Sequence, residues 1–292
     1  DATVLLNISP DHLDRHGGMD GYIAAKRRIF LNQGKGDTAI IGVDDPWCQQ
    51  ICTEITAANR RTIWPISAGK AMGRGVYALQ GVLYDATGDR VTEMADLLRA
   101  RSLPGRHNWQ NAAAAYAAAR AIGVSFAQAD IKLIYGGGGV GLMGAAARGA
   151  HETGGQVLGI IPQFLTGREQ PFDDVETIIV DNMHERKMLM FERADAFVVL
   201  PGGIGTLEEI IELLSWRRLD LHKKPIVFHN PRGFWDPLFS LLKHTIDEGL
   251  TPPTLADCWR SVEKAEDVVP ALLSWDADCY QSGPQTSVRL LT

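Results

Sequence analysis

Two glycine-rich loops, each directly after a short apolar run, constrain the fold of this chain more than any other feature. The first run, residues 131–135, leads into the glycines of residues 136–144, and the second, residues 196–200, leads into residues 201–205. Short β-branched runs are typical of strands buried on both faces of a parallel sheet. A glycine loop between such a strand and a helix lets backbone N–H groups approach an anion, because no Cβ intervenes. The pattern predicts an α/β fold with an anion-binding edge.

Strands and helices alternate through residues 126–273. Further strand-like runs occupy residues 156–161, 178–180 and 225–229, and helical stretches separate them. This alternation predicts a Rossmann-like, doubly wound parallel sheet with helices on both faces. Ligands of such sheets bind at the carboxyl ends of the strands. We therefore expect the helix at residues 183–191 and the loop after the second glycine-linked strand to face one crevice.

The segment from Pro201 to Glu209 has two interpretations on its own. As an anion cradle with a carboxylate one turn away, it indicates chemistry on a phosphorylated sugar. As a tight strand-to-helix turn, its acidic residues would only compensate the helix dipole. The basic residues Arg186 and Lys187 pose the same choice, because a solvated basic cluster on a surface helix is the ordinary alternative to a binding site.

The composition excludes several classes of protein. The 292 residues are 45% hydrophobic and 22% charged, as in ordinary globular domains. The net charge of −6 argues against general binding to nucleic acids or membranes. No apolar run approaches the roughly 18 residues that span a bilayer, and we expect no signal peptide. Four cysteines do not form a disulfide framework, so we expect reduced thiols in a cytoplasmic protein.

Residues 1–125 follow a different pattern. A polar loop containing His12, a helix containing Lys26 and the segment ending in Asn108 resemble the central, ATP-binding domain of the muramyl-peptide ligases, and most closely the D-glutamate-adding ligase. The resemblance implies that His12 helps to hold magnesium, that Lys26 is carbamylated and also serves the metal, and that Asn108 lies near the nucleotide.

The ligase-like part lacks one feature that this chemistry needs. The family holds the ATP phosphates in a Gly-x-x-Gly-Lys-[Ser/Thr] loop, and this motif does not occur in the sequence. We therefore expect no ligase activity, and we interpret residues 1–125 as a partial α/β ligase central domain. A ligase-derived binding module remains an alternative.

The second part of the chain resembles the Lonely Guy family, the cytokinin riboside 5′-monophosphate phosphoribohydrolases. The resemblance rests on residues 136–144, on Met183-His184-Glu185-Arg186-Lys187, and on residues 201–206 with Glu209. It implies cleavage of the N-glycosidic bond of adenosine 5′-monophosphate or its N6-modified forms, which releases the free base and ribose 5-phosphate. Family members assemble as homodimers or larger homo-oligomers. The site uses side chains and backbone amides, so we expect neither metal nor cofactor.

The resemblance also assigns roles to residues. Arg186 and Glu209 form the catalytic pair, and the Glu209 carboxylate would stabilise positive charge at the anomeric carbon or steer water. Contacts with the phosphate or with other parts of the substrate are implied for Gly137, Gly138, Gly141, Glu169, Lys187, Gly202, Gly203, Ile204, Gly205, Thr206, Glu208 and Ser215.

One departure from the family concerns the start of its domain. Family members open with a strand, a phosphate loop and a helix, whereas here ligase-like sequence joins near residues 125–129. Either the ligase-like part supplies a substitute strand, or the site is incomplete and the chain is an inactive chimera. The last segment, residues 274–292, is polar and aperiodic, and we expect it to be disordered.

Overall fold

The computed structural model divides the chain into two compact units, residues 1–121 and 122–292. It describes residues 2–10, 16–100, 105–167, 171–275 and 287–291, the last segment as backbone only. Helix α4, Arg106–Gln128, runs through the boundary between the units. The boundary expected after residue 125 falls within the same helix.

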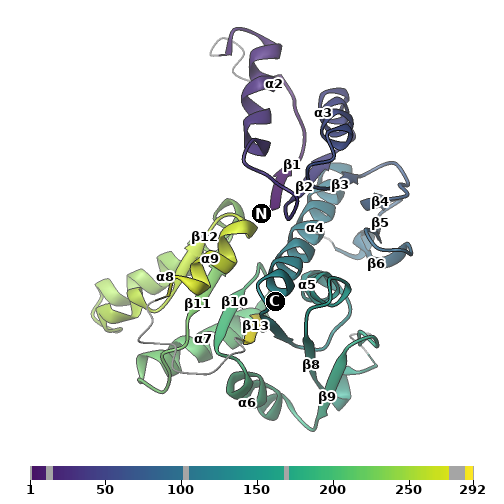
Figure 1. Ribbon diagram of the computed structural model, residues 1–292. Coiled ribbons are helices and arrows are strands. Elements are labelled where there is room, and N and C mark those ends of the chain that lie inside the picture. Colours follow the sequence, from purple (N-terminus) through teal and green to yellow (C-terminus); the bar gives the residue numbers. More distant parts are fainter. Residues whose placement is uncertain (1, 11–15, 101–104, 168–170, 276–286, 292) are drawn as a thin grey trace. The chain divides into compact units, whose positions relative to one another are not determined.

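The first unit contains a six-stranded mixed sheet. Its order is β1-β2-β3-β4-β5-β6 (Figure 1). Neighbouring strands from β1 to β4 are parallel, whereas β5 is antiparallel to both β4 and β6. The strands are β1 Ala2–Leu5, β2 Thr38–Gly42, β3 Thr62–Ser67, β4 Gly75–Leu79, β5 Val82–Ala86 and β6 Thr92–Asp96. Gln80 and Gly81 have positive φ angles of 52° and 85°, which is the geometry of a tight hairpin turn between β4 and β5.

Within residues 16–100 of the first unit, the α-helices are α2 Met19–Arg27 and α3 Pro46–Ala57. Helix α3 begins where Asp45 Oδ1 accepts a hydrogen bond from the Cys48 N–H at 2.8 Å, which satisfies one of the free donors of the first turn. Its apolar face, which includes Cys48 and Ile51, packs on β2 in a buried cluster with Phe30 and Ile41.

The second unit is a seven-stranded sheet in which every strand pair is parallel. Its order is β12-β11-β10-β13-β7-β8-β9. The strands are β7 Lys132–Tyr135, β8 Val157–Pro162, β9 Glu176–Val180, β10 Ala196–Val199, β11 Ile226–His229, β12 Arg260–Val262 and β13 Ser287–Leu291. The doubly wound parallel α/β architecture predicted for this part of the chain is confirmed.

The C-terminal strand β13 corrects the sequence-based expectation for residues 274–292. Residues 287–291 are not disordered but form a central strand, paired with β10 on one side and β7 on the other. The strand at the centre of this sheet therefore comes from the C-terminal segment and not from the ligase-like part, while the alternative of an inactive chimera stays a prediction. A strand of five residues is too short for its hydrophobic pattern to predict the distant strands with which it pairs.

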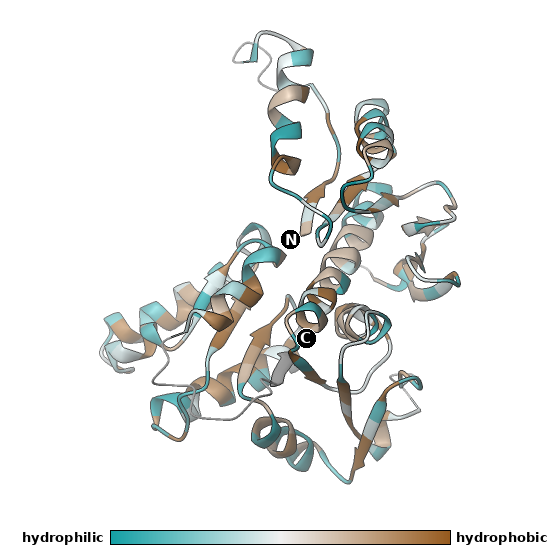
Figure 2. Ribbon diagram, in the orientation of Figure 1, coloured by the Kyte–Doolittle hydropathy of each residue, from teal (hydrophilic) through white to brown (hydrophobic). Residues whose placement is uncertain are grey.

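The helices of the second unit connect its strands and bury one face each. They are α5 Gly141–Glu152, α6 Met183–Arg193, α7 Ile204–Arg218, α8 Asp236–Asp247 and α9 Val268–Leu273. Apolar residues of α7, such as Leu213, pack with Phe197 of β10 and Phe228 of β11 in one buried cluster. Figure 2 shows the same division, with hydrophobic strands and more hydrophilic outer helix faces.

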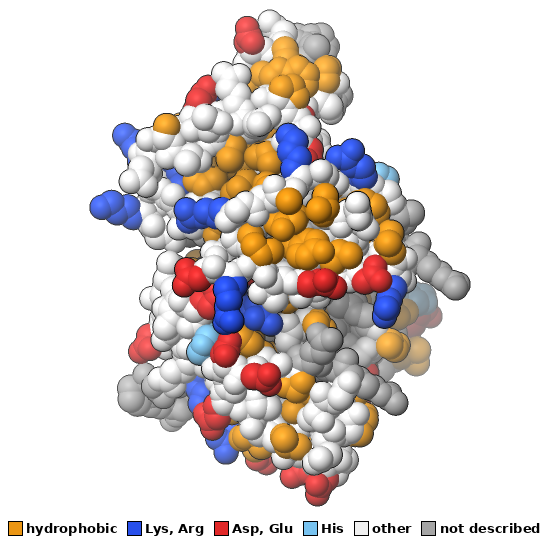
Figure 3. Space-filling model, turned by 90° about the vertical axis from the view of Figure 1, so that its right-hand side faces the viewer, with side chains coloured by type: hydrophobic (Ala, Val, Ile, Leu, Met, Phe, Trp, Pro, Cys, Tyr) orange, Lys and Arg blue, Asp and Glu red, His pale blue; other side chains and the backbone are white. Residues whose placement is uncertain are grey.

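The surface mixes charges of both signs. On the face in Figure 3, Lys and Arg side chains alternate with Asp and Glu, and hydrophobic patches lie between them. The cysteines in the described ranges, Cys48, Cys52 and Cys258, are buried free thiols. Among the helices of the described ranges, none combines the length and the hydropathy needed to cross a bilayer.

Candidate active site

The loop between β10 and α7 leads into a helix N-terminus that has no side-chain cap among the described residues. Gly203 precedes the first residue of α7 and has no side chain of its own to serve as the cap. The N–H groups of the first turn of a helix lack intrahelical partners and carry the positive end of the dipole. Thr206 is 1% exposed, and its hydroxyl has no hydrogen-bond partner among the described atoms. A buried, unpaired hydroxyl beside free N–H groups is suited to binding an anion.

Gly202 makes room for that hydroxyl. A Cβ at Gly202 would lie 2.1 Å from Thr206 Oγ1, so no larger residue fits without moving the threonine. By contrast, a Cβ at Gly203 or Gly205 would meet no atom within 4 Å, and Ile204 is 84% exposed. The loop is therefore tight on the side of Thr206 and open on its outer side.

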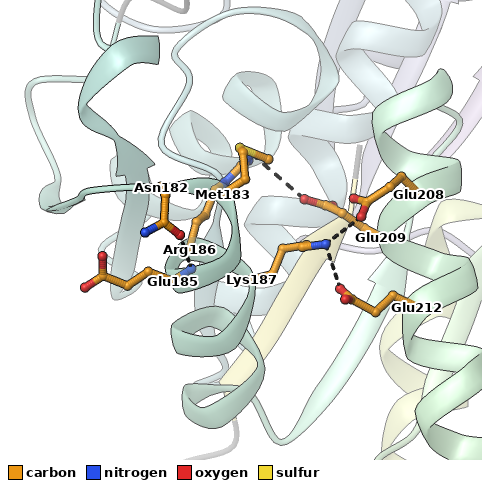
Figure 4. Close-up of polar contacts among 8 residues, drawn as sticks. All are labelled: Asn182, Met183, Glu185, Arg186, Lys187, Glu208, Glu209 and Glu212. Carbon is orange, nitrogen blue, oxygen red and sulfur yellow. Dashed lines mark hydrogen bonds and ion pairs between the residues drawn. The ribbon is translucent and has the colours of Figure 1, made fainter.

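A capping arrangement fixes the start of α6, the helix that carries the basic residues. Asn182 Oδ1 accepts a hydrogen bond from the Glu185 N–H at 2.9 Å (Figure 4). Glu185 Oε2 in turn accepts one from the Asp181 N–H at 2.9 Å. This reciprocal pattern satisfies donors that would otherwise be free at the helix start. It sets the direction of the first turn, from which Arg186 and Lys187 extend.

Arg186 and Glu209 face each other from α6 and α7. Arg186 Nη1 lies 3.9 Å from Glu209 Oε1, and the two side chains are only 10% and 8% exposed. The same nitrogen lies 3.8 Å from the Met183 sulfur, while Arg186 Nε has no hydrogen-bond partner in the described part of the chain. An ion pair at this distance leaves guanidinium N–H groups available, and a desolvated cation attracts an anionic ligand strongly.

A second ion-pair group lies beside the first. Lys187 Nζ is 2.5 Å from Glu208 Oε1 and 3.0 Å from Glu212 Oε2 (Figure 4). Burial alone would lower the pKa of Lys187, but hydrogen bonds to Glu208 and Glu212 outweigh burial and raise that pKa. Lys187 is thus an ammonium group held by two carboxylates, and it ties α6 to α7.

The glycine loop after β7 reaches the same place. A Cβ at Gly136 would lie 1.9 Å from Arg186 Nη2 and 3.0 Å from the Met143 sulfur, so the guanidinium rests against bare backbone. Gly137 has a φ of 83°, a conformation that favours glycine, and a Cβ there would lie 2.8 Å from that of Ile161. The loop therefore shapes the position of Arg186 from the opposite side of the pair.

The structure brings together most of the residues that the sequence analysis placed in this site. Arg186, Lys187, Glu208 and Glu209 meet through the two ion-pair groups, close to the α7 N-terminus that holds Thr206. Ser215 lies further along α7 and is exposed. Gly138 forms an isolated bridge with Pro171, and Gly141 begins α5 with a φ of 69°. Glu169 lies outside the described residues.

The ligase-like residues are placed as follows. Lys26 is exposed on α2, with its ammonium 5.3 Å from the centre of the Tyr22 ring. Asn108 lies in the first turn of α4 and accepts a hydrogen bond from Asn111 Nδ2 at 3.4 Å. His12 lies outside the described residues. Among the residues that are described, no group of three or more His, Cys, Asp or Glu side chains forms a metal-binding cluster.

Three residues at the site were not singled out from the sequence. Gly136 lies against the Arg186 guanidinium, the Met143 sulfur borders the same glycine, and Glu212 completes the Lys187 group. Glu212 stands four residues after Glu208 on the same helix face, so helical spacing could have indicated it. Gly136 could not be distinguished from the neighbouring glycines, because its contact with Arg186 is tertiary.

Comparisons with known proteins match the two parts of the chain to two different families. The model of the Mur ligase middle domain matches residues 1–119, and a model described as possible lysine decarboxylase matches residues 143–272. UDP-N-acetylmuramoylalanine–D-glutamate ligase of Caulobacter sp. (strain K31) is 95% identical over 129 residues, which are 44% of this chain and 28% of the ligase. The chain thus spans little more than a quarter of this relative's length.

Relatives of the second part are covered more completely. Cytokinin riboside 5′-monophosphate phosphoribohydrolase LOG of Oryza sativa subsp. japonica is 40% identical over 188 residues, which are 59% of this chain and 76% of that protein. LOG3 of Arabidopsis thaliana is 38% identical, with 55% of this chain and 74% of that protein covered. A molybdenum cofactor carrier protein of Chlamydomonas reinhardtii aligns with a TM-score of 0.41 and 22% identity, over 55% of this chain and 89% of that one.

Proposed function

The chain belongs, through its second unit, to the family of cytokinin riboside 5′-monophosphate phosphoribohydrolases, and on this premise we propose that it hydrolyses a nucleoside 5′-monophosphate. The substrate is adenosine 5′-monophosphate or an N6-modified form of it. The products are the free base, adenine or a cytokinin, and ribose 5-phosphate. The proposal extends to the assignment of Arg186 and Glu209 as the catalytic pair.

One observation carries the proposal: the buried Arg186–Glu209 pair lies next to a helix N-terminus where, among the residues that the structure describes, no side chain forms a cap and the threonine hydroxyl has no partner. A nucleoside 5′-monophosphate has a dianionic phosphate and a sugar carbon that becomes positively charged as the base leaves. The N-terminus of α7 and Thr206 suit the phosphate. The Glu209 carboxylate suits the positive charge at the sugar.

The proposed reaction breaks the bond between the anomeric carbon and the base nitrogen. The bonding electrons leave with the base, which takes up a proton, and water supplies the hydroxyl that joins the sugar. Glu209 stabilises the oxocarbenium-like transition state or orients the water. Arg186, whose Nε is without a partner in the described structure, donates hydrogen bonds to the phosphate or to the departing base.

In this proposal Lys187 and Glu208 have a structural role, unlike Arg186, which contacts the substrate. The resemblance assigns both to substrate contacts, but the two side chains pair with each other. We therefore assign them to the alignment of α6 with α7. A raised pKa also counts against a decarboxylase with a Schiff base at Lys187, since such a lysine must become neutral to react.

A second copy of the chain is the proposed macromolecular partner. Ile204 and Ile211 are exposed on α7 at 84% and 42%. Family members assemble through helices that flank the site, so these side chains are candidates for a homodimer contact. The cytoplasmic location expected from the sequence stays a prediction, as do the absence of a cofactor and of nucleic-acid partners.

The test is incubation of the full chain with adenosine 5′-monophosphate and with its N6-prenylated form, followed by chromatography of the free base and assay of ribose 5-phosphate. We expect both products in equal amounts. Glu209→Gln keeps the size of the side chain and removes its charge, and should lower the rate by about 100-fold or more. Glu248→Gln, at an exposed position after α8, is the matched control.

The outcome also decides between the proposal and its main alternative. A folded chain that releases no base from either nucleotide would support the alternative of an inactive chimera. Release that persists at full rate in Glu209→Gln would overturn the assignment of the catalytic pair and leave the activity itself standing.

A further inference from the structure

Strand β13 occupies a central position in the sheet of the second unit. Its residues Val288 to Leu291 lie beside residues 196–199 of β10, and Ser287 to Arg289 lie beside residues 132–134 of β7, both in parallel register. Figure 1 shows this strand, at the C-terminal end of the chain, between the strands of the second unit. Two ladders of backbone hydrogen bonds therefore depend on one short segment.

Without β13, the order of the sheet contains two groups of strands that do not pair with each other. One group is β12-β11-β10 and the other is β7-β8-β9. Every other strand pair of the sheet lies within one of these groups. In the strand order, β13 is thus the element that joins them.

The two halves of the candidate site belong to different groups. Helix α6, which carries Arg186, connects β9 to β10 in the chain, but its Met190 packs with residues of β7, β8 and β9, so the helix rests on the second group. Gly136 follows β7 of the same group. Helix α7, which carries Thr206 and Glu209, follows β10 of the first group. The distance of 3.9 Å between Arg186 and Glu209 therefore spans the junction that β13 fills.

The strands beside β13 belong to the buried core of the sheet that β13 completes. Residues 196–199 of β10 are fully buried, and so are Leu133 and Tyr135 of β7. Backbone N–H and C=O groups that lose their partners in such surroundings are costly to leave unpaired. An empty position between β10 and β7 would therefore not persist, and the two groups would shift or open.

We propose that Ser287–Leu291 is a positioning segment for the reaction: by inserting between β10 and β7, it brings Arg186 and Glu209 to their working distance. The inference rests on the proposed function for its link to catalysis. It assigns the segment no contact with the substrate. The place between β10 and β7 selects for backbone conformation: it takes an extended strand that pairs in parallel with both neighbours.

The first experiment compares Leu290→Pro with Leu290→Val in the full chain. Proline removes an N–H group from the centre of a strand that pairs on both sides, whereas valine keeps the N–H group and favours strands. Amide hydrogen exchange is measured on residues 132–135 and 196–199, with residues 38–42 of β2 in the first unit as an internal reference. Base release from the nucleotide is measured in parallel.

We expect Leu290→Pro to exchange at least about tenfold faster at β7 and β10, with β2 unchanged. Base release should fall by about 100-fold or more, as it would if the catalytic pair were misplaced. Leu290→Val should match the unaltered chain in both measurements. Equal protection of β7 and β10 in Leu290→Pro would overturn the inference.

The second experiment separates loss of the strand from general unfolding. A chain that ends at Trp275 should lose protection at β7 and β10, and a synthetic peptide of residues 285–292 should restore both protection and base release. Failure of the peptide to restore protection would count against the inference.

The two readouts also separate this inference from the proposed function. If the unaltered chain releases no base, exchange still tests whether β13 joins the two groups. If exchange rises in Leu290→Pro while base release is unaffected, the segment does not position the catalytic pair.

Discussion

Lys187 Nζ lies 2.5 Å from Glu208 Oε1. Lys187 follows Arg186 on α6 and Glu208 precedes Glu209 on α7, so this ion pair is adjacent to the facing pair Arg186 and Glu209. The ammonium is also 3.0 Å from Glu212, so these ion pairs join α6 to α7 where Arg186 and Glu209 face each other. The lysine side chain is 12% exposed, whereas Glu208 and Glu212 are 51% and 29% exposed, so water screens the group from the side of its carboxylates. The arrangement indicates a structural brace rather than a binding contact.

Replacing Lys187 tests this distinction. We expect Lys187→Met to lower kcat for base release by roughly 10- to 100-fold with a smaller change in KM, because the pair beside it loses its alignment. Lys187→Arg should recover part of the rate, since a guanidinium can pair with Glu208 and Glu212. Lys243→Met, which breaks an exposed pair with Asp247, is the control and should have no effect. A raised KM with unchanged kcat would instead identify Lys187 as a substrate contact.

Gly136→Ala tests the contact between the β7 loop and the guanidinium. The added Cβ would lie 1.9 Å from Arg186 Nη2, so the guanidinium must move away from its position. We expect base release to fall by about 100-fold, and thermal unfolding to change much less. In an Arg186→Ala background the same substitution should add little, because the group it displaces is gone. Rates measured for the two single variants and the double variant decide this, and additive losses would contradict the proposed contact.

The fold of the second unit was accessible from the sequence because its signals are local. The apolar runs before the two glycine loops became β7 and β10, and the basic helix became α6. Since the ends of parallel strands lie at one edge of a sheet, Arg186 and Glu209 could be expected to meet there. Their meeting at 3.9 Å agrees with that expectation.

The parts that the sequence did not predict depend on contacts between distant segments. Strand β13 pairs with β7 and β10, which lie far upstream in the chain, and its five residues have no periodicity that points to them. The Lys187 brace requires knowledge of which faces of α6 and α7 are opposed. The closeness of Gly136 to Arg186 likewise follows only from the packing of loop against helix.

The first unit contains a buried ion pair whose removal should destabilise it. Asp85 is 5% exposed, accepts a hydrogen bond from the Tyr116 hydroxyl at 3.0 Å, and lies 3.4 Å from Arg120 Nη1. Asp85→Ala leaves the buried Arg120 charge without this carboxylate, and should lower the free energy of unfolding of the unit by roughly 3–5 kcal/mol.

Oxidation of buried Met94 by peroxide across a urea series reports the unfolding of this unit. Asp89→Ala, at an exposed turn position, is the control and should shift the urea midpoint little. If Asp85→Ala shifts the urea midpoint no more than the control does, the Asp85–Arg120 pair makes no net contribution to the free energy of unfolding.

His229 should make the stability of the second unit depend on pH. It is the last residue of β11 and is 7% exposed, and burial lowers its pKa to about 4 despite a hydrogen bond to the Glu263 backbone. The unfolded chain, with an ordinary histidine pKa near 6.5, binds more protons than the folded chain between about pH 4 and pH 6.5. The stabilisation is therefore complete above about pH 6.5 and is lost as the pH falls toward 4.

The expected loss between pH 7 and pH 5 is about 2 kcal/mol from this residue. It is measured as the difference between the unaltered chain and His229→Gln, which cannot ionise, so that other titrating groups cancel. Urea unfolding of the second unit is followed by peroxide oxidation of buried Met190, a reaction that serves at both pH values. His244→Gln, at an exposed position on α8, should keep the pH dependence of the unaltered chain. If the free energy of unfolding depends on pH in the same way in His229→Gln as in the unaltered chain, His229 is protonated in the folded chain at pH 5, contrary to what its burial predicts.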